Sequence, residues 1–347
     1  MLKMSEHNSQ EHRTLFQYKQ GVQLDKKDIK ILYELYKNAR VPISVIAKKA
    51  ALSKDTIKYR IQRMEKSGLI LGYTAIINLN RLGYKWTMIV IQATFQNQHK
   101  EAEFLQFLQS SENIVRVMKC SGSWDYQCDV IFREQHELTQ TIRKIKELAL
   151  LLNFTVLTSL REVKYAHIPQ AFFRDIIHEP AQAPVGRIDE TQEKVALDST
   201  DFSLLKLLAQ NSRTSLLELS NKIQLSPDAT KKRTEKLQKN NVLRGYMPVI
   251  NTALLYDEHW IFMQTSGASD ILSYLKQHPH VQAIYEVGYN YDIFFWLSTK
   301  SVGEYEMLLS DIKTKFAGTI TKMDSVVALR EHKYMELSNV EITPACP

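Results

Sequence analysis

The sequence predicts an α+β protein in which one unit, a three-helix segment followed by an α/β sandwich, occurs twice in tandem. Residues 24–73 align without gaps with residues 197–246 and share 16 identities in 50 positions. Each segment precedes apolar patterns in the order strand, helix, strand, strand, helix, strand. A chain of 347 residues is long enough for two such units, which we call copy one and copy two.

The three helices are predicted from caps and apolar spacing. Asp25 can cap a first helix over 26–37, in which apolar residues recur at helical spacing. Pro42 suits the first turn of a short second helix. Ser53 is expected to cap a third helix, and Ser226 repeats that cap in copy two.

The third helix carries cationic side chains on one face and apolar side chains on the other. Short helices of which the last is capped by serine and rich in Lys and Arg predict a helix-turn-helix whose last helix enters the major groove of DNA. A three-helix bundle with a solvated cationic face is the alternative. The candidate DNA-contacting residues are Ser53, Lys54, Thr56, Lys58, Tyr59, Arg60 and Arg63 in copy one, and Ser226, Asp228, Thr230, Lys231, Lys232, Arg233 and Lys236 in copy two.

The candidates have different expected roles. We expect the positions from Lys54 to Tyr59 to lie nearest the base edges, and Arg60 and Arg63 to point outward and touch the phosphate backbone. Copy two places Lys231 to Arg233 in a row, which suits phosphates better than bases.

The positive charge is concentrated in the helical segments. Residues 24–72 carry a net charge of +7 and residues 197–245 one of +4, whereas the whole chain carries +7, so the remainder is about −4. A basic segment on an otherwise acidic chain is typical of a polyanion binder. Charge alone leaves nucleic acid, membrane surface and simple solubility open.

The second half of each copy predicts a ferredoxin-like βαββαβ sandwich. In copy one the expected strands are 86–95, 114–119, 126–132 and 154–164, with helices over 101–108 and 135–148. In copy two the strands are 260–265, 282–287, 293–297 and 320–329, with helices over 271–277 and 302–315.

These motifs resemble the Lrp/AsnC family of transcriptional regulators. The resemblance rests on the Leu-Asp-x-x-Asp start at 24–28, the Asn-Ala-Arg turn at 38–40 and the Gly-x-Ile-x-Gly-Tyr exit at 68–73. Residues 197–334 resemble the family more weakly. The resemblance implies a winged-type helix-turn-helix that binds double-stranded DNA, and a sandwich that oligomerises and senses a small effector such as an amino acid.

The resemblance also implies where an effector binds. The family's loop between the second and third sandwich strands has the form Gly-x-x-Asp, and copy one keeps it as Gly122, Trp124 and Asp125. In copy two the loop is one residue longer, and its candidates are Gly288, Asn290 and Asp292. Any β-hairpin needs turn residues, so a purely structural role is the alternative.

The expected organisation has seven parts. A polar tail covers 1–22; helix-turn-helix domains cover 23–78 and 196–251; sandwich domains cover 79–168 and 252–338; a linker covers 169–195; and a tail covers 339–347. The linker is long enough for the two copies to pair as a pseudo-dimer within one chain. Further assembly into a homo-oligomer is left open.

Composition points to a cytoplasmic protein with no membrane partner. No apolar run approaches the length of a transmembrane helix, and the first residues do not form a signal peptide. Three cysteines without close spacing predict neither a disulfide framework nor a metal site. No cofactor is expected.

Two other functions compete with the regulator. Siroheme decarboxylases share the two-part fold, but they need side chains gathered around a tetrapyrrole, and the ten histidines of this chain are scattered. A decarboxylase also has no reason to keep a cationic third helix. The other competitor is a small-molecule sensor that does not bind DNA.

Overall fold

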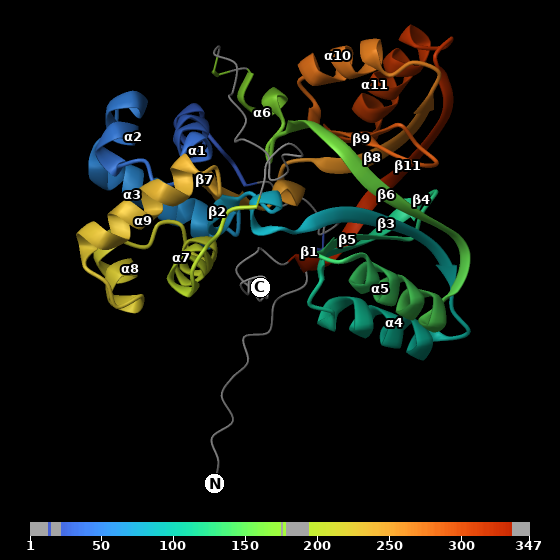
Figure 1. Ribbon diagram of the computed structural model, residues 1–347. Coiled ribbons are helices and arrows are strands. Elements are labelled where there is room, and N and C mark those ends of the chain that lie inside the picture. The colour runs from blue at the N-terminus through green and yellow to red at the C-terminus, as the bar shows by residue number, and fades with distance from the viewer. Residues whose placement is uncertain (1–12, 15–21, 175, 178–193, 335–347) are drawn as a thin grey trace.

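The computed structural model describes residues 13–14, 22–174, 176–177 and 194–334, and the predicted α+β fold is confirmed. Two three-helix domains lie together at one side of the molecule, and the two sandwiches form the other side (Figure 1). Most of the expected N-terminal tail, most of the linker and the whole C-terminal tail fall outside the described residues.

The helical domains have the predicted helices. Copy one contains α1 (Lys26–Lys37), α2 (Ile43–Ala50) and α3 (Lys54–Lys66). Copy two contains α7 (Ser199–Gln210), α8 (Leu216–Lys222) and α9 (Pro227–Lys239). α1 and α7 each begin with a capping box, in which the N-cap aspartate and a second aspartate three residues later satisfy each other's backbone amides.

A two-stranded ribbon joins the helical domains. β2 (Ile70–Ile77) follows α3, β7 (Leu243–Ile250) follows α9, and the two strands pair antiparallel. α7 of copy two packs on β2 of copy one, and α1 packs on β7. The helical domains therefore share one hydrophobic core, and neither buries its apolar faces alone.

Each sandwich has four strands and two helices. Copy one is built from β3 (Lys85–Thr94), α4 (Gln98–Ser110), β4 (Ile114–Gly122), β5 (Tyr126–Phe132), α5 (Gln135–Leu148) and β6 (Leu150–Tyr165). Copy two is built from β8 (Asp257–Thr265), α10 (Ser269–Gln277), β9 (Val281–Val287), β10 (Ile293–Thr299), α11 (Val302–Lys315) and β11 (Ile320–Tyr334). Short 3-10 helices η1 (Asn80–Leu82) and η2 (Thr252–Leu254) connect the ribbon to the sandwiches.

The two sandwiches close into one ring of strands. The order is β11, β4, β5, β3, β6, β9, β10, β8, and β8 pairs again with β11. The last strand of each copy thus pairs with the second strand of the other, as β6 with β9 and β11 with β4. β6 begins four residues before the predicted strand and pairs there with β3, whereas β11 continues five residues past its predicted end, where it pairs with β4. β1 (Arg13–Thr14) adds to the free side of β11.

Two layers of core follow from this closure. Aromatic and aliphatic side chains from both copies fill the inside of the ring, among them Trp260, Phe262 and Phe294. The helices of each sandwich cover the outer face of their own sheet over separate clusters (Figure 1). The alternation along each strand therefore buries both faces of the sheet.

A pair of lysines links each copy to the other. Lys164 at the end of β6 donates to the carbonyl of His278, which ends α10, and Lys333 on β11 donates to the carbonyl of Ser111, which ends α4. A cation at a helix C-terminus satisfies an orphan carbonyl and complements the helix dipole. The repetition of this contact shows that the copies are related by an approximate twofold arrangement.

The segment after β6, at the start of the expected linker, contains a helix. α6 (Gln170–Arg174) places Phe173 against Tyr33 and Tyr36 of α1, with ring centroids 5.3 and 5.5 Å apart. The start of the expected linker at 169 is therefore packed structure. Its far end is also attached, because the Val195 amide donates to the carbonyl of Arg81 in η1.

Candidate nucleic-acid interface and effector loops

The third helix of copy one begins as the sequence predicts. Ser53 accepts a hydrogen bond from the Thr56 amide at 3.1 Å, and its hydroxyl lies 2.8 Å from the Thr56 hydroxyl. Lys54, Lys58 and Tyr59 are exposed on α3, and Tyr59 reaches 66% relative exposure. Exposed side chains on the N-terminal half of a helix that enters the major groove can reach base edges.

The third helix of copy two has a different exposed face. Pro227 occupies the first helical position, and Lys231 and Lys232 are exposed where copy one has Lys58 and Tyr59. Asp228 is exposed in the first turn. α3 and α9, which we call the reading helices, therefore offer different side chains to a DNA duplex.

Thr230 was placed among the DNA-contacting residues, and the structure contradicts that placement. Its side chain is fully buried, and its hydroxyl donates to the Ser226 carbonyl at 3.0 Å. Thr230 occupies the position of Ile57, which is also fully buried. A threonine that bonds to the preceding turn can replace an apolar core residue at this position.

Arg60 was expected to face outward, but it faces α1. Its Nη1 atom lies 2.7 Å from Asp25 Oδ2 and 2.8 Å from Asp28 Oδ1. Arg63 also pairs with Asp28, whose side chain is fully buried. A buried carboxylate needs such partners, since an isolated charge there would be strongly destabilising.

Copy two repeats the contact of one arginine of the third helix with two aspartates at the start of the first helix, which we call the arginine clamp. Arg233 lies 2.7 Å from Asp198 and 2.7 Å from Asp201, although it was also expected to face DNA. In copy one, burial raises the pKa of the Asp25 carboxyl, but hydrogen bonds from the Asp28 amide and the Arg60 guanidinium outweigh it and lower the pKa to about 2. Arg60 in copy one and Arg233 in copy two therefore each fix the reading helix of their own domain against its first helix. The sequence signal was the identity of these residues in both copies.

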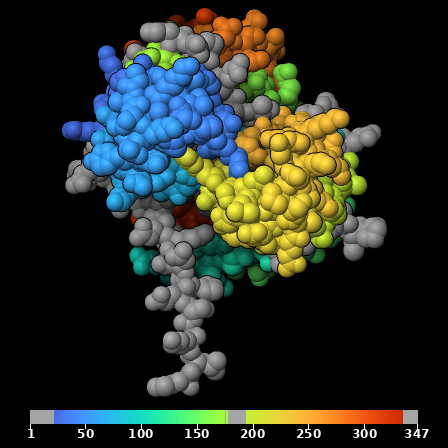
Figure 2. All heavy atoms as spheres, turned by 90° about the vertical axis from the view of Figure 1, so that its left-hand side faces the viewer, coloured from blue at the N-terminus to red at the C-terminus, as the bar shows by residue number. Residues whose placement is uncertain are grey.

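Further contacts hold the two helical domains in one body. Arg40 donates to the carbonyls of Ser212 and Thr214, at 2.5 and 3.0 Å, and its guanidinium lies 5.3 Å from the centroid of the Tyr246 ring. Arg213 in turn lies 4.9 Å from the ring of Tyr73. Figure 2 shows the result, with residues of copy one in blue and residues of copy two in yellow side by side on one face.

The loop at Gly122 is held against the last strand of copy two. Gly122 has a φ of +131°, and a Cβ atom there would collide with the carbonyl oxygen of Ser325 on β11. The Ser123 amide donates to the same carbonyl at 3.2 Å. Asp125 accepts from the Ala93 amide at 2.9 Å, whereas Trp124 is buried at 2% exposure and packs inside the ring.

The loop at Gly288 makes the corresponding contacts with β6 of copy one. The Gly288 amide donates to the Thr158 carbonyl at 3.1 Å, and Asn290 donates to the Thr155 hydroxyl at 3.2 Å. Asp292 accepts from the Thr265 amide at 2.7 Å, as Asp125 does from Ala93. Both aspartates thus hold the loop against the first strand of their own sandwich, and both loops lie where the copies meet.

Neither a membrane helix nor a metal cluster occurs within the part of the chain that the structure describes. None of the helices described there is long and apolar enough to cross a membrane. The same residues contain no group of three or more His, Cys, Asp or Glu side chains that could hold a metal ion.

Known protein families match three segments of the chain. The winged helix-turn-helix DNA-binding family matches residues 24–70, the AsnC-type helix-turn-helix domain matches residues 197–238, and the Lrp/AsnC ligand-binding domain matches residues 88–168. Both reading helices described above lie wholly or almost wholly inside the helix-turn-helix matches.

Curated relatives match one unit of the chain. An uncharacterised HTH-type transcriptional regulator of Pyrococcus furiosus is 31% identical over 124 residues, which cover 35% of this chain and 80% of the relative. The proline dehydrogenase transcriptional activator of Rhodobacter capsulatus is 35% identical over 125 residues, covering 35% of this chain and 77% of that protein. LrpB of Bacillus subtilis is 27% identical over 143 residues, which cover 41% of this chain and 93% of LrpB.

A solved structure matches the chain over nearly its whole length. The siroheme decarboxylase NirDL has a TM-score of 0.63 and 15% sequence identity, and the match covers 90% of this chain and 93% of that one. At that identity the likeness concerns the fold. It shows that two helix-turn-helix plus sandwich units joined in one chain form a recurring architecture.

Proposed function

This chain belongs to the Lrp/AsnC family of DNA-binding transcriptional regulators, and from that premise we propose that it recognises an asymmetric operator as one preformed pair of readers. The observation that carries the proposal is that two different reading helices, α3 and α9, belong to helical domains that share one hydrophobic core and one β-ribbon. Separate subunits of a homodimer present identical helices, which favour palindromic operators.

The residues we propose for base recognition lie on α3. Lys54, Thr56, Lys58 and Tyr59 are exposed or partly exposed along its N-terminal half. In copy two, Lys231, Lys232 and Lys236 are exposed, and we assign them to phosphates. Copy one would then set the sequence preference, and copy two would supply affinity that depends weakly on sequence.

Regulation by a small effector is part of the proposal. The match to the Lrp/AsnC ligand-binding domain covers the loop of Gly122 and Asp125, and both effector loops touch the other copy. A ligand at either loop would therefore change the contacts between the two sandwiches. An amino acid remains the effector that the resemblance favours.

We propose that the chain acts without catalysis, and the likeness to NirDL supplies the competing function. Titration with an iron tetrapyrrole separates the two. A regulator gives no saturable Soret change and binds labelled duplex at low salt, with an affinity that falls steeply as salt rises. Tight tetrapyrrole binding together with no duplex binding would replace the regulator with the enzyme.

A further inference from the structure

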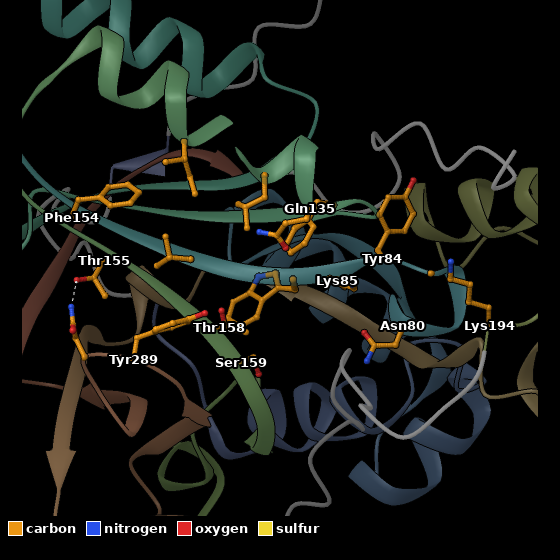
Figure 3. A pocket seen from close by; sticks show the side chains of 17 residues that line it. Asn80, Tyr84, Lys85, Gln135, Phe154, Thr155, Thr158, Ser159, Lys194 and Tyr289 are labelled. Carbon is orange, nitrogen blue, oxygen red and sulfur yellow. Dashed lines mark hydrogen bonds between the residues drawn. The ribbon is translucent and has the colours of Figure 1, made fainter. Parts of the chain in front are cut away.

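A groove with a volume of about 990 Å³ opens beside the start of β3. Its walls come from η1, β3, α5 and β6 of copy one, the Tyr289–Asn290 loop of copy two, and Lys194 at the end of the inter-copy segment. Figure 3 shows it as elongated, with Phe154 and Tyr289 at one end and Asn80 and Lys194 at the other. The volume lies within the range of small-molecule sites.

The groove has an apolar wall and a positive charge. Eight of its lining side chains are aromatic or aliphatic, among them Tyr84, Trp86, Phe132 and Phe154. Its charged lining groups are Lys85 and Lys194, both exposed, and no carboxylate is among the described residues that line it. The guanidinium of Arg133 stacks on the outer side of this wall, 4.4 Å from the Tyr84 ring centroid.

One lining hydroxyl is available to a ligand. The Ser159 hydroxyl oxygen is buried and makes no hydrogen bond to the residues that the structure describes. Buried hydroxyl groups in proteins are nearly always hydrogen-bonded, so a ligand in the groove could supply the partner that the described residues do not. Its position beside Thr158 on β6 places it within the groove (Figure 3).

The groove is not repeated in copy two. The residues of β8 that correspond to Lys85 and Trp86 at the start of β3 are Asp257 and Glu258, which reverse the charge and remove the aromatic ring. Lys194 belongs to the segment between the copies, and its side chain packs on Gly83, where a Cβ atom would lie 2.8 Å from Lys194 Cε. The site therefore depends on the covalent duplication.

We propose that this groove binds an amphipathic organic anion, with a carboxylate or phosphate held by Lys85 and Lys194 and an apolar body lying on Tyr84 and Trp86. As an effector site it rests on the proposed function. The ligand would touch η1, which continues from the ribbon, and Lys194, five residues before α7 begins. A ligand bound there would contact copy one's sandwich and both connections that lead to the DNA-binding domains.

The probe is octanoate, with octylammonium and octanol as matched controls of charge. Trp86 lines the groove and reports binding through its fluorescence, and the Trp86→Phe variant shows how much of the signal it supplies. We expect saturable binding of octanoate and at least tenfold weaker binding of the other two probes. Equal binding of octanol, or no saturable binding of octanoate, would overturn the proposal.

The double variant Lys85→Glu/Lys194→Glu locates the site, since both lysines are exposed and line the groove. Its octanoate affinity should fall at least tenfold, measured by equilibrium dialysis. Lys100→Glu/Lys144→Glu makes the same charge change outside the groove and should leave the affinity unchanged. Equal losses in both variants would mean that the probe responds only to net charge.

Duplex binding by the same preparations keeps the two proposals separate. Octanoate binding in the groove without any duplex binding would contradict the proposed DNA-binding function and support the proposed anion site. Duplex binding without octanoate binding would support the DNA-binding function and contradict the anion site. If octanoate binds but shifts duplex affinity equally in the wild type and in Lys85→Glu/Lys194→Glu, the groove is not an effector site.

Discussion

Arg60 on α3 lies 2.8 Å from Asp28 on α1, and this contact fixes the reading helix of copy one to the first helix of its own domain. Asp28 is fully buried and is also the second aspartate of the capping box. The same carboxylate therefore starts one helix and orients another. Because Arg233 and Asp201 repeat the contact at 2.7 Å, the two reading helices are positioned in the same way despite their different surfaces.

Replacing Arg60 should affect stability before it affects DNA binding. Arg60→Ala leaves Asp28 with Arg63 as its remaining cationic partner, so we expect the free energy of unfolding to fall by about 2 kcal/mol. Lys58→Ala, two positions away and exposed, should change it by less than about 0.5 kcal/mol. Urea unfolding of both variants measures the difference. An Arg60→Ala protein as stable as the wild type would show that the clamp is not needed.

The exposed lysines of α3 should carry base contacts. Lys54→Ala/Lys58→Ala is expected to weaken binding to the preferred operator roughly tenfold or more while lowering the salt slope by less than about 1.8, the value for two lost phosphate contacts. The matched variant is Lys231→Ala/Lys232→Ala in copy two, which should lower affinity on all sequences alike. Fluorescence anisotropy at several salt concentrations gives both quantities. Unchanged affinity in a folded Lys54→Ala/Lys58→Ala protein would remove α3 as the reader.

Two glycines at equivalent loops should respond differently to the same substitution. Gly122→Ala forces a side chain into a backbone conformation at φ +131° and against Ser325, so we expect a loss of about 2 kcal/mol or more in the free energy of unfolding. Gly288→Ala would meet only Leu160 at 3.9 Å and should be tolerated. Thermal unfolding compares them. Similar losses in both variants would contradict this account of the loops.

Stability should rise with pH through the titration of Lys333. Burial lowers the pKa of this lysine from 10.5 to about 8, so between these values the unfolded chain binds more protons than the folded chain. The free energy of unfolding of the wild type should therefore increase from pH 8 toward pH 10 relative to Lys333→Met, which cannot titrate there. A constant difference between the two proteins across this range would show that Lys333 has no lowered pKa.

Sequence signals between neighbouring residues were sufficient to predict the helices and strands, but not the contacts between distant elements. Caps such as Asp25 and Ser53 and the apolar spacing of α1 are properties of neighbouring residues, and they predicted the helices. Closure of the ring depends on pairings such as β6 with β9, whose register is set by packing between distant segments. The inter-copy pairing was expected only in outline.

Side-chain direction at the edge of a helix was the main source of error. Arg60 lies between the exposed face and the buried face of α3, and its partner Asp28 is 32 residues earlier in the chain. Thr230 is polar, which favours an outward position, but it is equivalent to the buried Ile57 and is itself buried. The groove at Lys194 could not be anticipated, since it needs segments from both copies and from the residues between them.

The central claim is that the two unlike reading helices of one chain act together on one operator. Selection of bound sequences from a random duplex pool, with the full chain, tests it most directly. We predict an asymmetric consensus with one well-defined half-site and one tolerant half-site, separated by about one helical turn of 10–10.5 base pairs or a multiple of it. A perfect palindrome would contradict the account, because it would mean that copy one pairs with copy one of another chain.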